Sequence, residues 1–238
     1  MNLKNTLKEI LIILGIDATK NVKYDRLTRK ILQTTLKTNS NCIDIGCHKG
    51  EILALMIQYA PNGKHFAFEP IPALNKKLQQ KFSDRANIYP YALAEKSGNS
   101  TFNWVKNAPA YSGLKKRKYD ISNPKIEKID VEIRTLNEII PDDVKIDFIK
   151  IDVEGAELGV LKGASRVLQN QPTVLFEFGL GASDYYNTQP EDIFKLFNNH
   201  QLNIYTLDDY VHNKMPLTLQ RFKDYYSNNT EYYFIASK

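Results

Sequence analysis

The chain has few of the residues that mark several classes of protein. Its 238 residues include two cysteines and one tryptophan, with 11 glycines and 10 prolines. Cys42 and Cys47 are too few and too close together for a disulfide framework or a structural zinc site, so they favour a reducing compartment. The modest glycine and proline contents exclude collagen-like and low-complexity chains.

Long apolar runs are also missing. The longest run near the start, residues 10–14, is followed at once by Gly15 and Asp17, whereas a membrane-spanning helix needs roughly 20 apolar residues. We therefore expect no transmembrane segment. Apolar residues in 3–14 recur at helical spacing without the pattern of a secretory signal. This favours an amphipathic helix in a cytoplasmic protein.

The charge balance is mild. There are 32 basic and 27 acidic residues, a formal net charge of +5, which suits either acidic partners or simple solubility. The densest basic run, 115–118, lies among Trp104, Tyr111 and Tyr119. Such a segment could bind a phosphorylated or nucleotide-linked sugar or a nucleic acid, or it is a solvated loop.

Short apolar strands alternate with helical patterns along most of the chain. This alternation is typical of an α/β protein with a parallel sheet covered by helices on both faces. The last strand follows a long polar and aromatic stretch, 208–230, without a crossover-helix pattern, so we predict that it is antiparallel and lies beside the fifth. We interpret 104–128 as an irregular insertion. The predicted strands are 42–45, 65–69, 88–92, 148–151, 174–178, 204–207 and 232–236.

The chain divides into two parts in this interpretation. Residues 1–40 form an N-terminal helical segment, with helices near 3–14 and 24–37, that packs on the domain or on a partner. Residues 41–238 form the single α/β domain. A homodimer through the N-terminal helices is the expected form of any self-association.

The first strand leads into a candidate nucleotide site. Asp44 ends the strand, Gly46 allows a tight turn beside a ligand, and Gly50 opens the next helix, whose free amides attract an anion. The dinucleotide fingerprint G-x-G-x-x-G is absent. Glu69 lies at the end of the second strand, where a carboxylate can accept both ribose hydroxyls of an adenosine. The alternatives are a loop-capping role for Asp44 and a surface position for Glu69.

At these residues the sequence resembles the class I S-adenosylmethionine-dependent methyltransferases, specifically the FkbM family. The most specific block is 146–157, IDFIKIDVEGAE, followed by LKGA at 161–164. Motifs at 44–50, 68–70 and 92–98 add to it, and the likeness covers about 41–201. The resemblance implies a doubly wound, Rossmann-like, seven-stranded, mostly parallel sheet with an antiparallel last strand.

The resemblance also implies the cofactor and the residues that hold it. S-adenosylmethionine would lie over the Gly46 turn, with its ribose on the acid at the end of the second strand and its adenine near Ala92. Many methyltransferases have an acid or amide near this last position to bind the adenine amino group. The implied cofactor-binding residues are Asp44, Gly46, Gly50, Glu69, Ala92 and Asp152.

Three acids are implied to lie near the reactive methyl group: Asp152, Glu154 and Glu177. Fixed carboxylates there complement a sulfonium charge, and one can take the proton of a hydroxyl acceptor. Either Glu154 or Glu157 could instead cap the helix that follows, and His48 is a less favoured base. Carboxylate oxygens suit hard cations, but nothing in the spacing demands a metal, and we predict none.

The predicted function is O-methylation of a hydroxyl on a sugar or secondary metabolite. The acceptor is expected between the 104–118 insertion and the segment 208–226. A nucleic-acid methyltransferase is disfavoured because the place of the usual Asn or Asp, Pro, Pro, aromatic motif holds Asp152, Val153, Glu154 and Gly155. A Rossmann-type oxidoreductase or a non-catalytic nucleotide binder is the remaining alternative.

Overall fold

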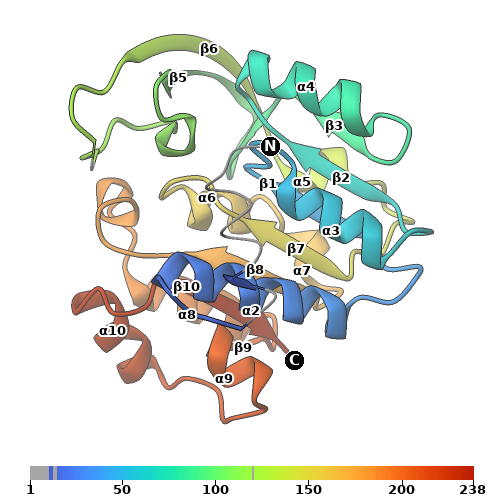
Figure 1. The fold of residues 1–238 in the computed structure, drawn as a ribbon, viewed down its shortest axis with the longest axis vertical. Helices are drawn as coiled ribbons and strands as arrows, with labels where there is room; N and C mark the ends of the chain where they lie inside the picture. The colour runs from blue at the N-terminus through green and yellow to red at the C-terminus, as the bar shows by residue number, and fades with distance from the viewer. Residues whose placement is uncertain (1–10, 13–14, 120) are drawn as a thin grey trace.

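A computed structural model describes residues 11–12, 15–119 and 121–238. Its centre is a seven-stranded sheet with the strand order β3-β2-β1-β7-β8-β10-β9 (Figure 1). In chain order, the strands of this sheet are β1 (Cys42–Ile45), β2 (His65–Phe68), β3 (Asn87–Tyr89), β7 (Phe148–Ile151), β8 (Thr173–Glu177), β9 (Asn203–Thr206) and β10 (Tyr233–Ser237).

The pairing confirms the predicted sheet. Strands β3, β2, β1, β7 and β8 form consecutive parallel pairs. The last strand, β10, runs antiparallel to both β8 and β9 and lies between them. Strand β8 is the fifth of the predicted strands, so the antiparallel last strand lies where the sequence placed it.

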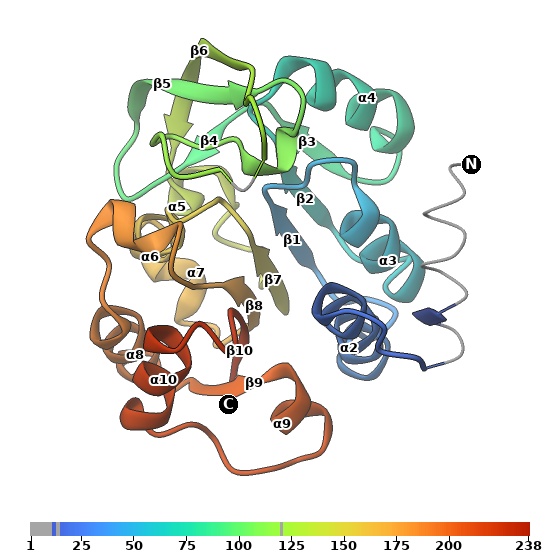
Figure 2. The ribbon, with the colours of Figure 1, turned by 60° about the vertical axis from the view of Figure 1, so that its left-hand side comes forward.

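Helices cover both faces of this sheet, with α2 and α3 on one side and α6, α7 and α8 on the other (Figure 2). No helix in the described ranges is long and apolar enough to span a bilayer. The α-helices are α2 (Lys20–Thr35), α3 (Glu51–Tyr59), α4 (Pro72–Phe82), α5 (Leu136–Ile139), α6 (Glu157–Lys162), α7 (Ser165–Leu168), α8 (Pro190–Asn199), α9 (Leu207–Val211) and α10 (Leu219–Ser227).

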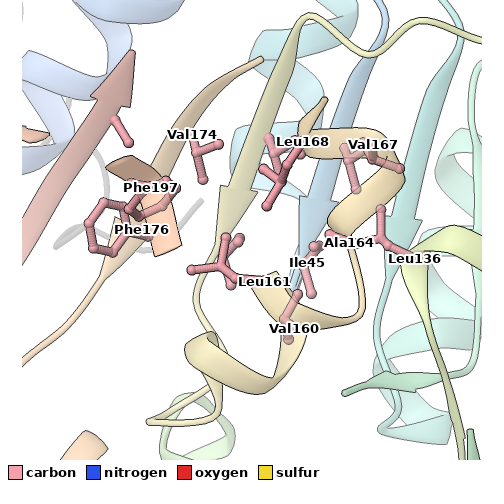
Figure 3. Close-up of a cluster of buried hydrophobic side chains, with 14 of the residues drawn as sticks. Ile45, Leu136, Val160, Leu161, Ala164, Val167, Leu168, Val174, Phe176 and Phe197 are labelled. Atoms are coloured by element: carbon pink, nitrogen blue, oxygen red, sulfur yellow. The ribbon is translucent and has the colours of Figure 1, made fainter. Parts of the chain in front are cut away.

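The larger part of the core lies under α6 and α7. Figure 3 shows Val160 and Leu161 of α6 and Leu168 of α7 directed at the central strands. Alternate residues of a strand point to opposite faces, and in β1 Ile43 joins this core while Cys42 packs on the α2 side. The two-faced burial explains why the central strands are almost continuously apolar.

Helix α2 is fastened to the domain by an apolar stripe. The Thr19 side chain accepts a hydrogen bond from the Val22 amide at 3.2 Å and caps the helix. Leu27 and Ile31 are buried in the cluster that also contains Ile235 of β10. The helix predicted near 3–14 lies almost entirely outside the described residues, and the homodimer through this segment stays a prediction.

A second, three-stranded sheet corrects the prediction for residues 104–128. Strand β5 (Gly98–Val105) pairs antiparallel with β6 (Ile126–Arg134), and β4 (Ala92–Leu93) pairs parallel with β6. The two ends of the supposed irregular insertion are therefore strand. Phe102 and Val131 bury one face of this sheet, whereas much of the other face is polar and partly exposed, which weakens the apolar pattern that sequence analysis depends on.

The polar stretch 208–230 is also more regular than predicted. It contains most of α9 and all of α10, which is capped by the Thr218 hydroxyl. Only Phe222 and Tyr226 of α10 are buried. Two anchors on a nine-residue helix are too few to give a clear periodic signal.

Candidate active site

A cavity of about 640 Å³ opens beyond the carboxyl ends of the parallel strands. Ligands of open α/β sheets bind at this edge, and the volume is in the range of small-molecule sites. Residues that follow β1, β2, β7 and β8 line it, together with residues of α2 and of the second sheet. The cavity therefore joins segments from the whole length of the chain.

The turn after β1 forms one wall. Gly46 has a φ of +71°, and a Cβ there would lie 1.9 Å from the Asp152 carbonyl oxygen. A side chain at this position would separate the ends of β1 and β7, so the close approach of the two turns requires glycine. Gly46 and His48 both line the cavity.

Two of the predicted cofactor residues do not reach the cavity wall. Asp44 is completely buried, with its carboxylate Oδ1 3.6 Å from Lys150 Nζ. Gly50, at φ +77°, packs against Phe82 and Leu78. Neither residue is among those that line the cavity, and their part in cofactor binding stays a prediction.

Glu69 does line the cavity. Its Oε2 accepts the His48 amide at 2.8 Å and its Oε1 accepts the Ile71 amide at 2.9 Å. Burial raises the pKa of this carboxyl to about 7, although the two amide bonds favour the ionised form. The carboxylate is thus fixed in place, and each oxygen keeps acceptor capacity for a further donor.

The neighbouring wall is apolar and aromatic. Tyr91, Ala92 and Leu93 line it, and Phe102 from the second sheet joins them. The ring of Tyr91 continues a stack formed by Phe68 and Tyr89, with centroid distances of 5.2 and 5.8 Å. A flat aromatic ligand would find stacking surface here.

The three predicted acids meet on the opposite side of the cavity. One oxygen of each of Asp152, Glu154 and Glu177 lies within 4.8 Å of the others. We call this group the carboxyl cluster. Asp152 accepts a hydrogen bond from the Tyr233 hydroxyl at 2.7 Å and lies 3.4 Å from Lys150 Nζ. Lys150 thus offsets part of the negative charge of the cluster.

The three carboxyl groups differ in their pKa values. Burial disfavours ionisation of Asp152, but Lys150 and hydrogen bonds from Glu177 and Tyr233 outweigh it, so its pKa is lowered. Burial and the charge of Asp152 raise the pKa of Glu154 to about 8, although Arg117 opposes the shift. The same two causes raise the pKa of Glu177 well above its usual value. Asp152 is therefore the carboxyl group of the cluster that ionises most readily, and Glu154 and Glu177 keep their protons to higher pH.

Lys150 connects the two sides of the site, and its role was missed in the sequence. Its ammonium group donates to the Gly46 carbonyl at 3.0 Å and faces both Asp44 and Asp152. Burial alone would favour the neutral amine, but the two carboxylates raise the pKa of Lys150. A lysine inside the apolar strand sequence FIKI is the signal that could have identified it.

The turn after β7 presents Glu154 to the cavity. Glu154 and Gly155 both have positive φ, at 59° and 105°. Oε1 of Glu157 accepts the Val153 and Gly155 amides at 3.1 Å each, which gives Glu157 the structural role. Glu154 instead forms an ion pair with Arg117. Its side chain therefore faces the site and does not cap the helix.

The segment 109–118 covers this acid. The guanidinium of Arg117 also donates to the Gly181 carbonyl at 3.1 Å and lies 5.1 Å from the centroid of the Tyr111 ring. The Lys115 amide donates to the Tyr186 hydroxyl at 2.9 Å. These contacts hold the segment 109–118, which we call the basic loop, against the 3₁₀ turn at Ser183–Tyr186.

Helix α2 supplies a wall of the cavity that we expected from residues 208–226 on the basis of the sequence. Its residues Asn21, Tyr24 and Thr28 line the cavity with Tyr232. None of residues 208–226, all of them described, contributes to the lining, so the expected second acceptor wall is corrected. The Tyr232 hydroxyl donates to Asn21 Oδ1 at 2.6 Å, and the Tyr24 and Tyr232 rings meet edge to face. This contact joins α2 to the segment before β10.

The residues present fit S-adenosylmethionine. Glu69 offers a fixed carboxylate for ribose hydroxyls, the Tyr91 wall offers stacking surface for adenine, and the carboxyl cluster complements a sulfonium charge. The cavity lies at the edge of the sheet where Gly46 allows a ligand to approach the backbone. The ribose, the adenine and the sulfonium group thus each have a matching surface.

Comparison with known proteins agrees with this fit. Residues 44–203 match the model of the methyltransferase FkbM domain. Methyltransferase sdnD of Sordaria araneosa is 32% identical over 54% of this chain and 61% of its own length. The 2-O-methyltransferase NoeI of Sinorhizobium fredii is 24% identical over 64% of this chain and 69% of its own.

A hexuronic acid methyltransferase, AglP of Haloferax volcanii, is 33% identical over 58% of this chain and 54% of its own length. The match thus spans less than two thirds of sdnD and AglP. The crystal structure of methyltransferase FkbM from Methylobacillus flagellatus KT superposes with a TM-score of 0.50 at 18% identity, covering 84% of this chain and 44% of that one. The chain belongs to the FkbM family of S-adenosylmethionine-dependent methyltransferases.

Proposed function

We propose that this methyltransferase methylates a hydroxyl oxygen of a saccharide-type acceptor. The observation that carries the proposal is that the carboxyl cluster faces the same cavity as the Gly46 turn and Glu69. A cofactor held at that turn places its methyl group beside carboxyl groups that can accept a proton. Two similar proteins named for 2-O- and hexuronic acid methylation support oxygen as the nucleophile.

The cofactor is held by residues on one side of the cavity. Glu69 would accept the ribose hydroxyls, and Tyr91, Ala92 and Leu93, which line the same cavity, would pack on the adenine. When bound, S-adenosylmethionine supplies an electrophilic methyl group on a positively charged sulfur. Asp44 acts beneath the turn by holding Lys150, which in turn holds the Gly46 carbonyl.

The acceptor lies between the basic loop and helix α2. Tyr111 and Arg117 of the basic loop and Asn21 and Tyr232 all line the cavity. Aromatic faces next to planar amide and guanidinium groups suit a sugar ring, because its C–H faces pack on tyrosine while its hydroxyls bind polar groups. Alignment of acceptor and donor supplies much of the acceleration in a displacement of this kind.

Glu154 is the proposed base. Asp152 is held by Tyr233 and Lys150 and has a lowered pKa, which makes it a weak base. Glu154, although paired with Arg117, has a pKa raised to about 8, close to the value that suits proton transfer near neutral pH. The acceptor O–H bond breaks as its proton passes to the Glu154 carboxylate. The oxygen forms its bond to the methyl carbon as the sulfur–carbon bond breaks.

A nucleic-acid acceptor is the alternative that the basic loop keeps open. Lys115 and Arg117 are both tied to the protein, through Tyr185 and Glu154, so only part of the run is free to contact phosphates. This favours a small acceptor over a polyanion.

The test is methyl transfer from labelled cofactor to a panel of free saccharides and glycosides, with RNA and DNA as further arms. We expect labelled methyl ethers with at least one saccharide. Glu154→Gln should lower kcat about 10²- to 10⁴-fold, the usual contribution of a general base, while cofactor binding measured by calorimetry changes little.

Glu191→Gln is the matched control, because Glu191 of α8 is half-exposed, pairs with Lys223 of α10 and does not line the cavity. It should leave the rate unchanged. Label in nucleic acid alone would contradict the proposed substrate class, and a Glu154→Gln enzyme as fast as wild type would contradict the proposed base.

A further inference from the structure

The last strand brings a buried hydroxyl to the carboxyl cluster. Tyr233 is the first residue of β10, and its hydroxyl donates to Asp152 Oδ2 at 2.7 Å. The antiparallel register pairs Tyr233 with Glu177 on β8. A residue 81 positions after Asp152 thus contacts the centre of the proposed site.

The tyrosine ring is held on more than one side. It lies 5.2 Å from the Tyr24 ring of α2 and 5.9 Å from the Tyr232 ring, measured between centroids. Burial and the nearby carboxylates raise the pKa of Tyr233 well above its usual value, so the group stays a neutral hydrogen-bond donor. A donor fixed in this way stabilises the anionic form of its acceptor.

We propose that Tyr233 is a positioning residue for methyl transfer: its hydroxyl holds Asp152 as the fixed anion of the carboxyl cluster, so that the acceptor proton passes to Glu154. The inference rests on the proposed function. Asp152 accepts from Tyr233 and faces Lys150, and Glu177 completes its surroundings through a hydrogen bond. Glu154 remains as the carboxyl group that faces the acceptor space.

Other charged and titratable groups also act on the cluster. Their contributions do not change when the Tyr233 hydroxyl alone is removed, because that change leaves the ring packing in place. The groups are Asp44 and His48 near the end of β1, Lys150 on β7, Arg117 in the basic loop, and Glu157 and Tyr186 beyond Glu154.

The test compares the pH dependence of kcat for wild type and Tyr233→Phe, using the saccharide acceptor found active with wild type. Without this donor the charge on Asp152 is less well stabilised, and the coupled cluster as a whole holds its proton more tightly. The acid limb of the profile should therefore move to higher pH, by less than the roughly one to two pH units expected at Asp152 itself. Cofactor binding by calorimetry should stay within a few-fold of wild type. Tyr226→Phe removes another buried hydroxyl, 3.4 Å from Ser183 Oγ and outside the cavity lining, and should leave the profile in place.

A double substitution separates positioning from folding. In an Asp152→Asn background, Tyr233→Phe should cause no further shift of the acid limb, because the anion on which the hydroxyl acts is gone. A rate reduced equally at every pH, or the same shift with and without Asp152, would overturn the inference while leaving the methyl transfer of the wild type intact. Absence of transfer by the wild type to every saccharide would overturn the proposed function, and this inference with it.

Discussion

Asp44 and Lys150 are register partners on the adjacent parallel strands β1 and β7, and their side chains form an ion pair of 3.6 Å inside the sheet. Asp44 belongs to the first motif of the sequence and Lys150 to the most specific one. Their contact, together with the Lys150 bond to the Gly46 carbonyl, joins the cofactor turn to the carboxyl cluster.

Breaking the pair from one side should destabilise the fold. Lys150→Met leaves the buried Asp44 carboxylate without its cation, which typically costs about 3–5 kcal/mol of unfolding free energy. The double variant Asp44→Leu, Lys150→Met removes both charges and should recover much of that loss. Urea denaturation at pH 7 measures both. Equal losses in the single and double variants would show that packing, and not charge pairing, is the cause.

Glu69 should matter for cofactor affinity. Glu69→Ala removes the ribose acceptor and should weaken binding of S-adenosylmethionine by about 1–3 kcal/mol, the usual value for hydrogen bonds to a charged group. Isothermal calorimetry is the measurement. Glu95→Ala serves as control, since Glu95 lies half-exposed beside Lys162 and outside the cavity lining. Unchanged affinity in Glu69→Ala would contradict the assigned ribose contact.

Glu157 should make the protein less stable as the pH rises. Burial raises the pKa of its carboxyl to about 7 in the folded state, against 4.5 as its ordinary value. Between these values the folded state binds more protons than the unfolded state, so the free energy of unfolding falls as the pH increases through that window.

The variant Glu157→Gln cannot ionise and keeps an acceptor oxygen for the two turn amides. Relative to wild type, it should gain roughly 1 kcal/mol of stability per pH unit between about pH 5 and pH 7, the upper bound being about 1.4 per unit. Urea denaturation at a series of pH values measures the difference. A difference that does not change with pH would show that Glu157 ionises normally in the folded protein.

Asn21 should affect the acceptor and not the cofactor. It lies on the α2 wall of the cavity, with its amide oxygen bound to the Tyr232 hydroxyl. Asn21→Ala should raise the KM for a saccharide several-fold and leave the calorimetric affinity for S-adenosylmethionine unchanged. Gln33→Ala, an exposed change on the same helix away from the cavity, is the control. A weaker cofactor affinity in Asn21→Ala would contradict the prediction, because it would show that Asn21 affects the cofactor and not the acceptor alone.

Local patterns were sufficient for the sheet. Apolar segments such as 148–151 predict buried strands, because a strand that is covered on both faces is apolar at nearly every position. Such a strand can be identified from its own residues alone. Glycine at 46 and the acids at 69 and 152 predicted the cofactor edge, since the carboxyl ends of parallel strands meet there. The second sheet was missed because the polar residues of β5 and β6 face solvent and give no apolar pattern.

The sequence by itself determined the family, a mostly parallel sheet with an antiparallel last strand beside the fifth, and the three acids that the structure collects within 4.8 Å. The tertiary structure decided what those acids face. Tyr233, Arg117 and the α2 wall come from distant parts of the chain, and no local spacing encodes their contacts. Burial and hydrogen-bonding or charged partners give neighbouring carboxyl groups different pKa values. The burial and the partners of each group depend on which residues folding brings together.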